Sequence, residues 1–273
     1  MKAFPMLDGK KPGQSTKYAY SDQLFFKNRD PRFNKTIAYN GTSWPLNGDT
    51  GYRLWTYYRG NSSVEPTASR TGFYTRKAID SRLSPAQAQF AGTDWIEIRY
   101  AEVLLNLAES ACGVGNIAEA YTQLKALRQR AGIEAGDGNY GLQAGMSRAQ
   151  MFEAILYERQ IELALEGKRF WDLRRWKKME SVLNGKKRTG VTITLKSTAP
   201  ANFATIRDGL SLDQVYTDYF EVIKFKDLDT RYTAGIKWKP EYYFFAIPQQ
   251  ALDNNPQLKQ NLLWPSGSFD PVQ

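Results

Sequence analysis

A helical repeat of apolar positions begins near Asp94 and is the clearest pattern in the chain. Apolar residues recur there at steps of three and four, which places them on one face of a helix. These residues are Ile96, Tyr100, Val103, Leu104, Leu107, Ala111 and Val114. After a glycine-containing turn the same period runs from Ile117 to Ala131, with Asn116 as a helix cap. The pattern predicts two antiparallel helices, with Leu104 and Leu107 buried at their interface.

A second pair of helices is predicted after a glycine-rich connector. Ser147 and Gln150 have the spacing of a capping box at the start of a helix. The predicted buried stripe of this helix consists of Phe152, Ile155, Leu156 and Leu163. Gly167 interrupts the period before a shorter helix, expected from about Arg169 to Met179. Pairs of helices that repeat along a chain are typical of a tetratricopeptide-like stack.

The regions on either side of these helices show other patterns. Residues 1–93 are rich in glycine, asparagine, proline and aromatic residues with little helical period, which predicts long loops with short strands. After Lys186 the chain becomes β-rich, and Val191 to Leu195 is the clearest strand. We therefore predict a mainly α fold: a loop-rich segment at 1–93, then a helical region with a β and loop tail at 94–273, together forming one continuous domain.

Composition and charge are those of an ordinary globular protein. The 273 residues are 42% hydrophobic and 24% charged, with a net charge of +9. The densest cationic stretch, Lys168 to Lys178, is interleaved with Trp171 and Trp176 on a predicted helix. We interpret it as a solvated helix face with ion pairs, and we expect no nucleic-acid partner. Both tryptophans, and the apolar run from Tyr242 to Ile247, are predicted to be core residues.

The residue types that are missing exclude several kinds of site. The sequence has no histidine, which rules out a Ser-His-Asp triad, a Cys-His pair and most zinc sites. Cys112 is the single cysteine, so an intramolecular disulfide and a cysteine metal cluster are also excluded. We expect no metal and no cofactor.

Three acidic residues could still suggest chemistry. Glu158, Glu162 and Glu166 are spaced four apart, and Arg159, Arg169 and Arg175 lie near them in sequence. Paired carboxylates can hydrolyse glycosides, but a general acid needs a raised pKa, which neighbouring arginines oppose. We predict that these glutamates make structural ion pairs and that the chain has no catalytic residues.

Four segments resemble the SusD/RagB family. "IEIRYAEVLLNLAES" from Ile96 to Ser110 and "ERQIELALEGKRFWDLRRW" from Glu158 to Trp176 resemble two signature helices of that family. "RDPRFNKTI" from Arg29 to Ile37 resembles an element from the middle of family members, and "FFAIPQQALDNNPQLKQN" from Phe244 to Asn261 resembles their closing segment. The two long motifs occur in the family's order.

The resemblance implies a nutrient-binding lipoprotein of the outer membrane. In this family a tetratricopeptide-like scaffold carries a loop-rich glycan-binding region, and the protein caps a TonB-dependent transporter of the SusC type during polysaccharide utilisation. Family members are much longer, and their lipidated cysteine lies N-terminal to anything that matches Met1. Cys112 lies within a predicted helix and is not that anchor. We therefore expect the chain to be part of a longer, surface-exposed protein whose lipid anchor is absent from this sequence.

An aromatic cluster before Asp94 is the candidate glycan platform. The predicted platform consists of Tyr39, Trp44, Asn47, Tyr52, Arg53, Trp55, Tyr57 and Tyr58. A pyranose face laid on a tryptophan or tyrosine ring buries on the order of 100 Å², which contributes roughly 2.5 kcal/mol. The alternative is that these rings pack beneath the loops as a small core.

Three functions follow from the sequence, in order of preference. The first is a non-catalytic glycan-binding component of a SusC/SusD-type uptake system. The second is a tetratricopeptide-type adaptor that binds a peptide or protein, and the third is a glycoside hydrolase.

Overall fold

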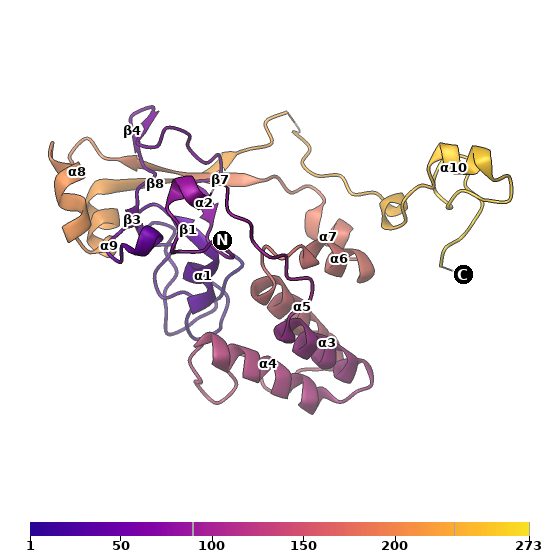
Figure 1. Cartoon of the computed structure of the whole chain (residues 1–273). Coiled ribbons are helices and arrows are strands. Elements are labelled where there is room, and N and C mark those ends of the chain that lie inside the picture. Colours follow the sequence, from indigo (N-terminus) through magenta and orange to yellow (C-terminus); the bar gives the residue numbers. More distant parts are fainter. Residues whose placement is uncertain (89, 232, 273) are drawn as a thin grey trace. The chain divides into compact units, whose positions relative to one another are not determined.

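The computed structural model describes residues 1–88, 90–231 and 233–272, and its contacts divide the chain into two compact units (Figure 1). The larger unit combines Met1–Arg169 with Thr189–Leu228, and the smaller unit combines Phe170–Arg188 with Asp229–Gln273. Helices are the main regular elements and the strands are short, which confirms the predicted mainly helical class. No helix within the described ranges is long and apolar enough to cross a membrane.

Three long helices form the framework of the larger unit. They are α3 (Tyr100–Gly113), α4 (Ile117–Ala131) and α5 (Arg148–Glu162), and α3 packs against both of the others. The two predicted caps are present: Asn116 accepts a hydrogen bond from the amide of Glu119, and Ser147 and Gln150 form a complete capping box. The apolar period therefore predicted these helices correctly. The division of the chain at residue 93 lies inside this unit and stays a prediction.

The predicted register of α3 is wrong for Leu107 and holds in part for Leu104. The helix begins at Tyr100 rather than near Asp94, and Leu107 is 45% exposed. Leu104 is half-buried and packs against the helical core, in which Leu105 is fully buried. The side of α3 that packs in the helical core is made largely of small residues, because Ala101, Ala108 and Cys112 accompany Leu105 there. Small side chains let two helices approach closely. Large apolar residues in α3 and on either side of it instead remain exposed: Trp95, Ile96, Ile98, Tyr100, Val103, Leu107 and Val114.

Short strands organise the loop-rich part of the larger unit. Antiparallel pairs form between β1 (Ile37–Tyr39) and β6 (Phe73–Thr75), and between β2 (Thr42–Ser43) and β3 (Arg53–Leu54). A four-stranded sheet has the order β5-β4-β7-β8, with β4 at Tyr58–Arg59, β5 at Ser62–Ser63, β7 at Thr189–Leu195 and β8 at Phe220–Asp227. β7 contains the strand predicted from the sequence. The remaining helical segments of this unit are α1 (Pro31–Thr36), η1 (Leu46–Gly48), α2 (Pro85–Ala88), α8 (Phe203–Ile206), η2 (Arg207–Gly209), α9 (Leu212–Gln214) and η3 (Val215–Tyr219).

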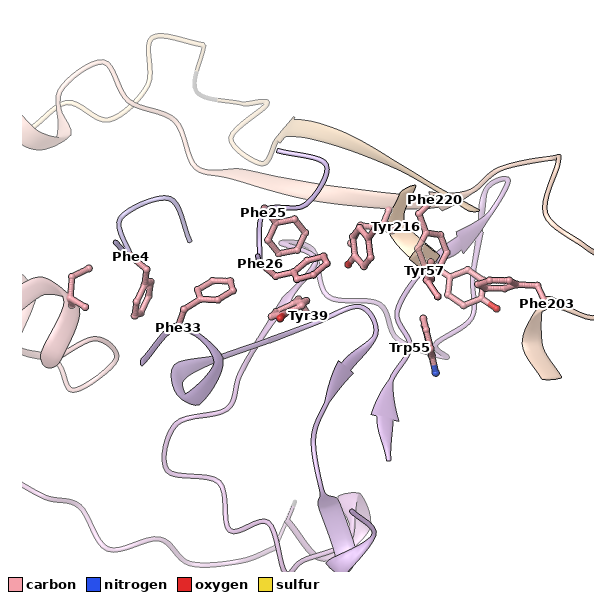
Figure 2. Packing of buried hydrophobic residues seen from close by; sticks show 13 residues of the cluster. Phe4, Phe25, Phe26, Phe33, Tyr39, Trp55, Tyr57, Phe203, Tyr216 and Phe220 are labelled. Carbon is pink, nitrogen blue, oxygen red and sulfur yellow. The ribbon is translucent and has the colours of Figure 1, made fainter. Parts of the chain in front are cut away.

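A core of aromatic rings holds these loops to the sheet (Figure 2). Phe25 makes an edge-to-face contact with Tyr39 at 5.2 Å between ring centroids, and Tyr57 packs against Phe220 on β8 at 5.1 Å. Because each ring buries a large apolar area, a few rings can stabilise a region that has little regular structure. The loop-rich segment thus has a core of its own, supplied partly by residues far along the chain.

Helix α5 contributes to both cores of the larger unit. Ile155 lies in the helical core with α3 and α4, and Ile161 lies in the aromatic core. Glu158 lies between these two anchoring residues in sequence, and Glu162 directly follows Ile161. The helix therefore holds its acidic side chains at fixed positions.

The smaller unit has a small core of its own, built on Leu173, Met179 and Tyr243. Its elements are most of α6 (Lys168–Arg175), α7 (Met179–Leu183), η4 (Pro240–Tyr243) and α10 (Gln249–Asn254). The single helix predicted from Arg169 to Met179 is two helices, because Lys177 adopts a left-handed conformation (φ 49°) between them. The run from Tyr242 to Ile247 is not a buried segment, since Phe245 is 61% exposed.

Candidate functional site

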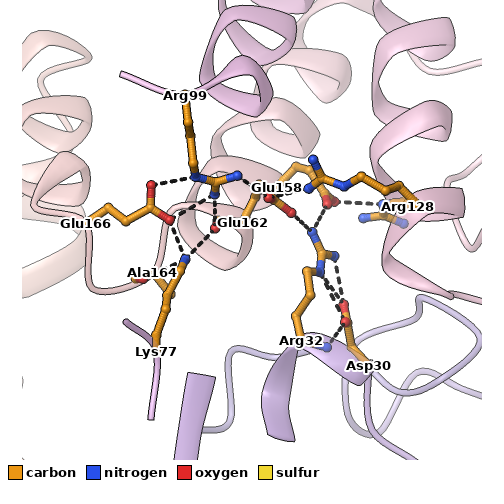
Figure 3. Close-up of polar contacts among 10 residues, drawn as sticks. Asp30, Arg32, Lys77, Arg99, Arg128, Glu158, Glu162, Ala164 and Glu166 are labelled. Atoms are coloured by element: carbon orange, nitrogen blue, oxygen red, sulfur yellow. Dashed lines mark hydrogen bonds and ion pairs between the residues drawn. The ribbon is translucent and has the colours of Figure 1, made fainter. Parts of the chain in front are cut away.

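The predicted acidic residues form the centre of a charged network in the larger unit (Figure 3). Glu158 and Glu162 are buried on α5, and Glu166 follows in the turn after the helix. Basic partners reach them from distant segments of the chain. These partners are Arg32, Lys77, Arg99, Arg128 and Arg130.

Glu158 is held between two guanidinium groups. Arg32 Nη1 lies 2.7 Å from its Oε1, and Arg128 Nε lies 2.7 Å from its Oε2. Arg32 is oriented in turn by Asp30, which accepts from its Nη2 at 2.7 Å and caps the start of α1. Charge-assisted hydrogen bonds from fixed guanidinium groups are strong, and here they satisfy a carboxylate that has no access to solvent.

Glu162 and Glu166 share further basic partners. Glu162 accepts from Arg32 at 2.8 Å, from Arg99 at 2.7 Å and from Arg130 at 2.5 Å. Arg99 Nε also lies 2.7 Å from Glu166, and its Nη2 donates to the backbone carbonyl of Glu162 at 2.6 Å. These donors also satisfy a carbonyl that the end of α5 leaves without a helical partner.

The electrostatics of the network keep all three glutamates ionised. Burial alone would raise the pKa of each carboxyl, but the ion pairs and hydrogen bonds from basic side chains outweigh it. The pKa of Glu162 is lowered to about 2, and those of Glu158 and Glu166 are also lowered. A glycosidase needs one carboxyl that stays protonated to donate to the leaving group, and these three do not meet that need.

A pocket of about 510 Å³, the cationic pocket, opens beside the network. Its lining residues are Pro31, Arg32, Lys35, Thr36, Lys77, Arg99, Arg130, Ala131, Ile161 and Glu162. Five of these carry a positive charge and one carries a negative charge, so the pocket favours an anionic or strongly polar ligand.

The structure distributes the predicted platform over separate places. Tyr57 is fully buried, Tyr39 is 3% exposed, and Trp44 and Trp55 are each 8% exposed. Tyr39, Trp55 and Tyr57 lie in the aromatic core, whereas Trp44 lies in a smaller cluster against which Tyr52 packs. These four rings therefore pack beneath the loops as core residues, which was the alternative to a glycan platform in the sequence analysis.

The other predicted platform residues keep some accessible surface. Tyr52, Arg53 and Tyr58 are half-buried, and Asn47 is exposed. Arg53 stacks on Trp55 at 4.7 Å and donates to the carbonyls of Gly41 and Leu210, so it has structural contacts. A glycan-binding role for the predicted platform stays a prediction.

An exposed aromatic cluster lies instead in the smaller unit. We define the aromatic patch as Phe170, Trp171, Arg174 and Phe245. Phe170 and Trp171 meet edge to face at 5.2 Å, and the Arg174 guanidinium lies 3.8 Å from the Phe245 ring centroid. The Nε of Arg174 donates to a backbone carbonyl at 2.6 Å, which fixes the group over the ring.

The sequence prediction that Trp171 and Phe245 are core residues is wrong. They are 57% and 61% exposed. Helix α6 has eight residues, of which only Asp172 and Leu173 are buried, so little of its surface can turn inward. The many lysine and arginine residues around Trp171 could have indicated its exposure, because a short, strongly basic helix keeps most of its side chains in water.

Comparisons with known proteins agree on one family. Residues 1–264 match the model of the SusD family. A SusD-like protein P2 from Formosa agariphila is 36% identical over 89 residues, which are 32% of this chain and 18% of that protein.

Solved structures of similar fold give the same result. A SusD-like protein from Bacteroides fragilis superposes with a TM-score of 0.66 at 25% identity, over 96% of this chain and 45% of that one. A SusD-like carbohydrate-binding protein from the same species gives a TM-score of 0.58 at 27% identity, over 93% of this chain and 46% of that one. The chain thus spans less than half the length of each of these relatives.

Proposed function

Because the chain belongs to the SusD family, we propose that it forms part of a non-catalytic, glycan-binding component of a SusC/SusD-type uptake system at the outer membrane. The observation that carries the proposal is the family match, which extends over residues 1–264. One relative of similar fold is described as a carbohydrate-binding protein, which supports the same class of ligand.

The aromatic patch is the surface that best fits a sugar. Trp171 and Phe245 offer exposed ring faces, and each pyranose stacked on such a ring buries on the order of 100 Å², worth roughly 2.5 kcal/mol before ordering costs. The Arg174 guanidinium between them can donate to sugar hydroxyls. Because Phe245 and a backbone carbonyl already hold this guanidinium, little of its conformational entropy is lost on binding.

Catalysis is not part of the proposal. The carboxylates that could have formed a glycosidase pair are held ionised by guanidinium groups, and none of the three can serve as a proton donor near neutral pH. A binding role requires no such donor.

Affinity electrophoresis through gels that contain single polysaccharides tests the proposal. We expect at least one polysaccharide to retard the chain, and Trp171→Ala or Phe245→Ala to reduce that retardation. Trp95→Ala is a matched control, because Trp95 is 72% exposed but lies in the larger unit. Each lost stack should weaken binding by about 1 to 3 kcal/mol, or about fivefold to a hundredfold.

Two results would contradict the proposal. If no polysaccharide retards the chain while an unstructured peptide library yields saturable binders, the peptide-adaptor function is favoured. If retardation occurs but Trp95→Ala lowers it as much as Trp171→Ala does, the aromatic patch is not the glycan surface. The transporter partnership is tested separately, by co-purification with a SusC-type protein encoded beside the gene.

A further inference from the structure

We infer that the cationic pocket binds the negatively charged group of an acidic glycan, a uronate carboxylate or a sulfate ester. The inference rests on the proposed glycan-binding function and deepens it by naming the class of sugar. It concerns the pocket beside α5 in the larger unit, which is a different surface from the aromatic patch.

The charges around the cationic pocket do not balance. The pocket and the network behind it contain six cationic side chains, namely Arg32, Lys35, Lys77, Arg99, Arg128 and Arg130. They contain four carboxylates, namely Asp30, Glu158, Glu162 and Glu166. The excess of two positive charges lies beside a cavity of about 510 Å³, which is in the range of small-ligand pockets.

The unused donors lie at Lys35 and Arg130. Arg32, Lys77 and Arg99 are engaged by several carboxylate or carbonyl oxygens each. Arg130 directs one nitrogen to Glu162 and keeps 53% of its side chain exposed. Lys35 is exposed, and no partner for its ammonium group is found within the described ranges. An incoming anion would therefore meet one ammonium and one partly engaged guanidinium group.

The single carboxylate in the pocket does not repel an anion strongly. Three guanidinium groups, those of Arg32, Arg99 and Arg130, already surround Glu162. Guanidinium groups bind planar carboxylates and sulfate oxygens through two parallel hydrogen bonds, which favours these groups over a hydroxyl. Pro31, Ala131 and Ile161 provide an apolar wall for the C–H face of the sugar ring.

Calorimetric titration with matched sugars tests the inference. The probes are tetragalacturonate, its fully methyl-esterified form, which has the same sugars without the charge, and a sulfated galactan oligosaccharide. We expect tetragalacturonate or the sulfated oligosaccharide to bind the parent at least tenfold more tightly than the ester. Lys35→Gln and Arg130→Gln should each remove about tenfold of that preference, and raising the salt concentration should weaken it.

Arg82→Gln is the matched control. Arg82 is 86% exposed, its described ion pair is with Asp80, and it is not one of the residues that line the pocket, so this change removes one positive charge without altering the lining. If Arg82→Gln lowers the affinity for the acidic probe as much as Lys35→Gln does, the effect is one of net charge and the inference fails. Circular dichroism melts check that both pocket variants remain folded.

The two proposals fail in different ways. Equal affinity for tetragalacturonate, the sulfated oligosaccharide and the methyl ester, together with Trp171-dependent binding of a neutral polysaccharide, overturns the acidic-sugar inference alone. Absence of binding to every sugar, neutral or acidic, overturns the glycan-binding function as well.

Discussion

Replacing Glu162 by glutamine removes the negative charge that Arg32, Arg99 and Arg130 share, and keeps the size of the side chain. The pKa of this carboxyl is lowered from 4.5 to about 2 in the folded protein. A pKa lowered on folding stabilises the native state at every pH above the unfolded value, and this stabilisation is lost as the pH falls toward the folded value. The shift corresponds to about 3 kcal/mol at pH 7 and about 1.5 kcal/mol at pH 3.

Urea unfolding of the parent and of Glu162→Gln at both pH values measures this difference. We expect the variant to be about 3 kcal/mol less stable at pH 7, and the gap to shrink by about half at pH 3. Glu97→Gln is the control, because the Glu97 side chain is 78% exposed and its ion pair with Lys168 should contribute less than about 1 kcal/mol. A gap below about 1 kcal/mol at pH 7, or one that stays the same at pH 3, would refute the reasoning.

Three further predictions concern packing and chemistry. Leu105→Ala should cost about 2 to 5 kcal/mol of unfolding free energy, whereas Leu107→Ala should cost less than about 0.5 kcal/mol; equal costs in urea melts would restore the register predicted from the sequence. Tyr57→Ala should lower the melting temperature markedly because the ring is fully buried, while Trp171→Ala should leave it nearly unchanged. If Trp171→Ala lowered the melting temperature more than Tyr57→Ala did, Trp171 would be the core residue and Tyr57 the surface residue. Incubation with polysaccharides should release no sugar by reducing-end assay, and release that disappears in Glu158→Gln would reopen the hydrolase function.

The parts of the fold set by local signals were predictable from the sequence. Asn116 before α4 and the Ser147–Gln150 pair before α5 act within one helical turn, so each could be recognised in isolation. The strand at Val191 to Leu195 was equally local, because consecutive β-branched residues favour an extended chain. The four family motifs led to the correct family.

The face that α3 buries depends on residues outside α3. Leu104 and Leu105 both contact the helical core, and small residues of α3 form much of the rest of the contact. Sequence periodicity gives more weight to large apolar residues such as Val103 and Leu107, which the structure leaves exposed.

The candidate site could be predicted only in part. The sequence identified Glu158, Glu162 and Glu166 as ion-paired, but Arg32 and Arg99 reach them from segments far away in sequence. Long-range contacts decide the burial of rings in the same way, because β8 lies far along the chain from the Tyr57 that it covers. An aromatic residue on turn-rich sequence can therefore be a platform or a core, and composition alone does not distinguish the two.

Non-catalytic glycan binding is tested most directly by titration calorimetry of the unmodified chain. The ligand is an oligosaccharide prepared from a polysaccharide that retards the chain in the gel assay, and its length is measured again after the titration. We expect saturable heat with a defined stoichiometry, lost in large part in Trp171→Ala, and recovery of the sugar at its original length. Absence of saturable heat, or recovery of shortened sugar from a reaction that the chain itself accelerates, would contradict this expectation.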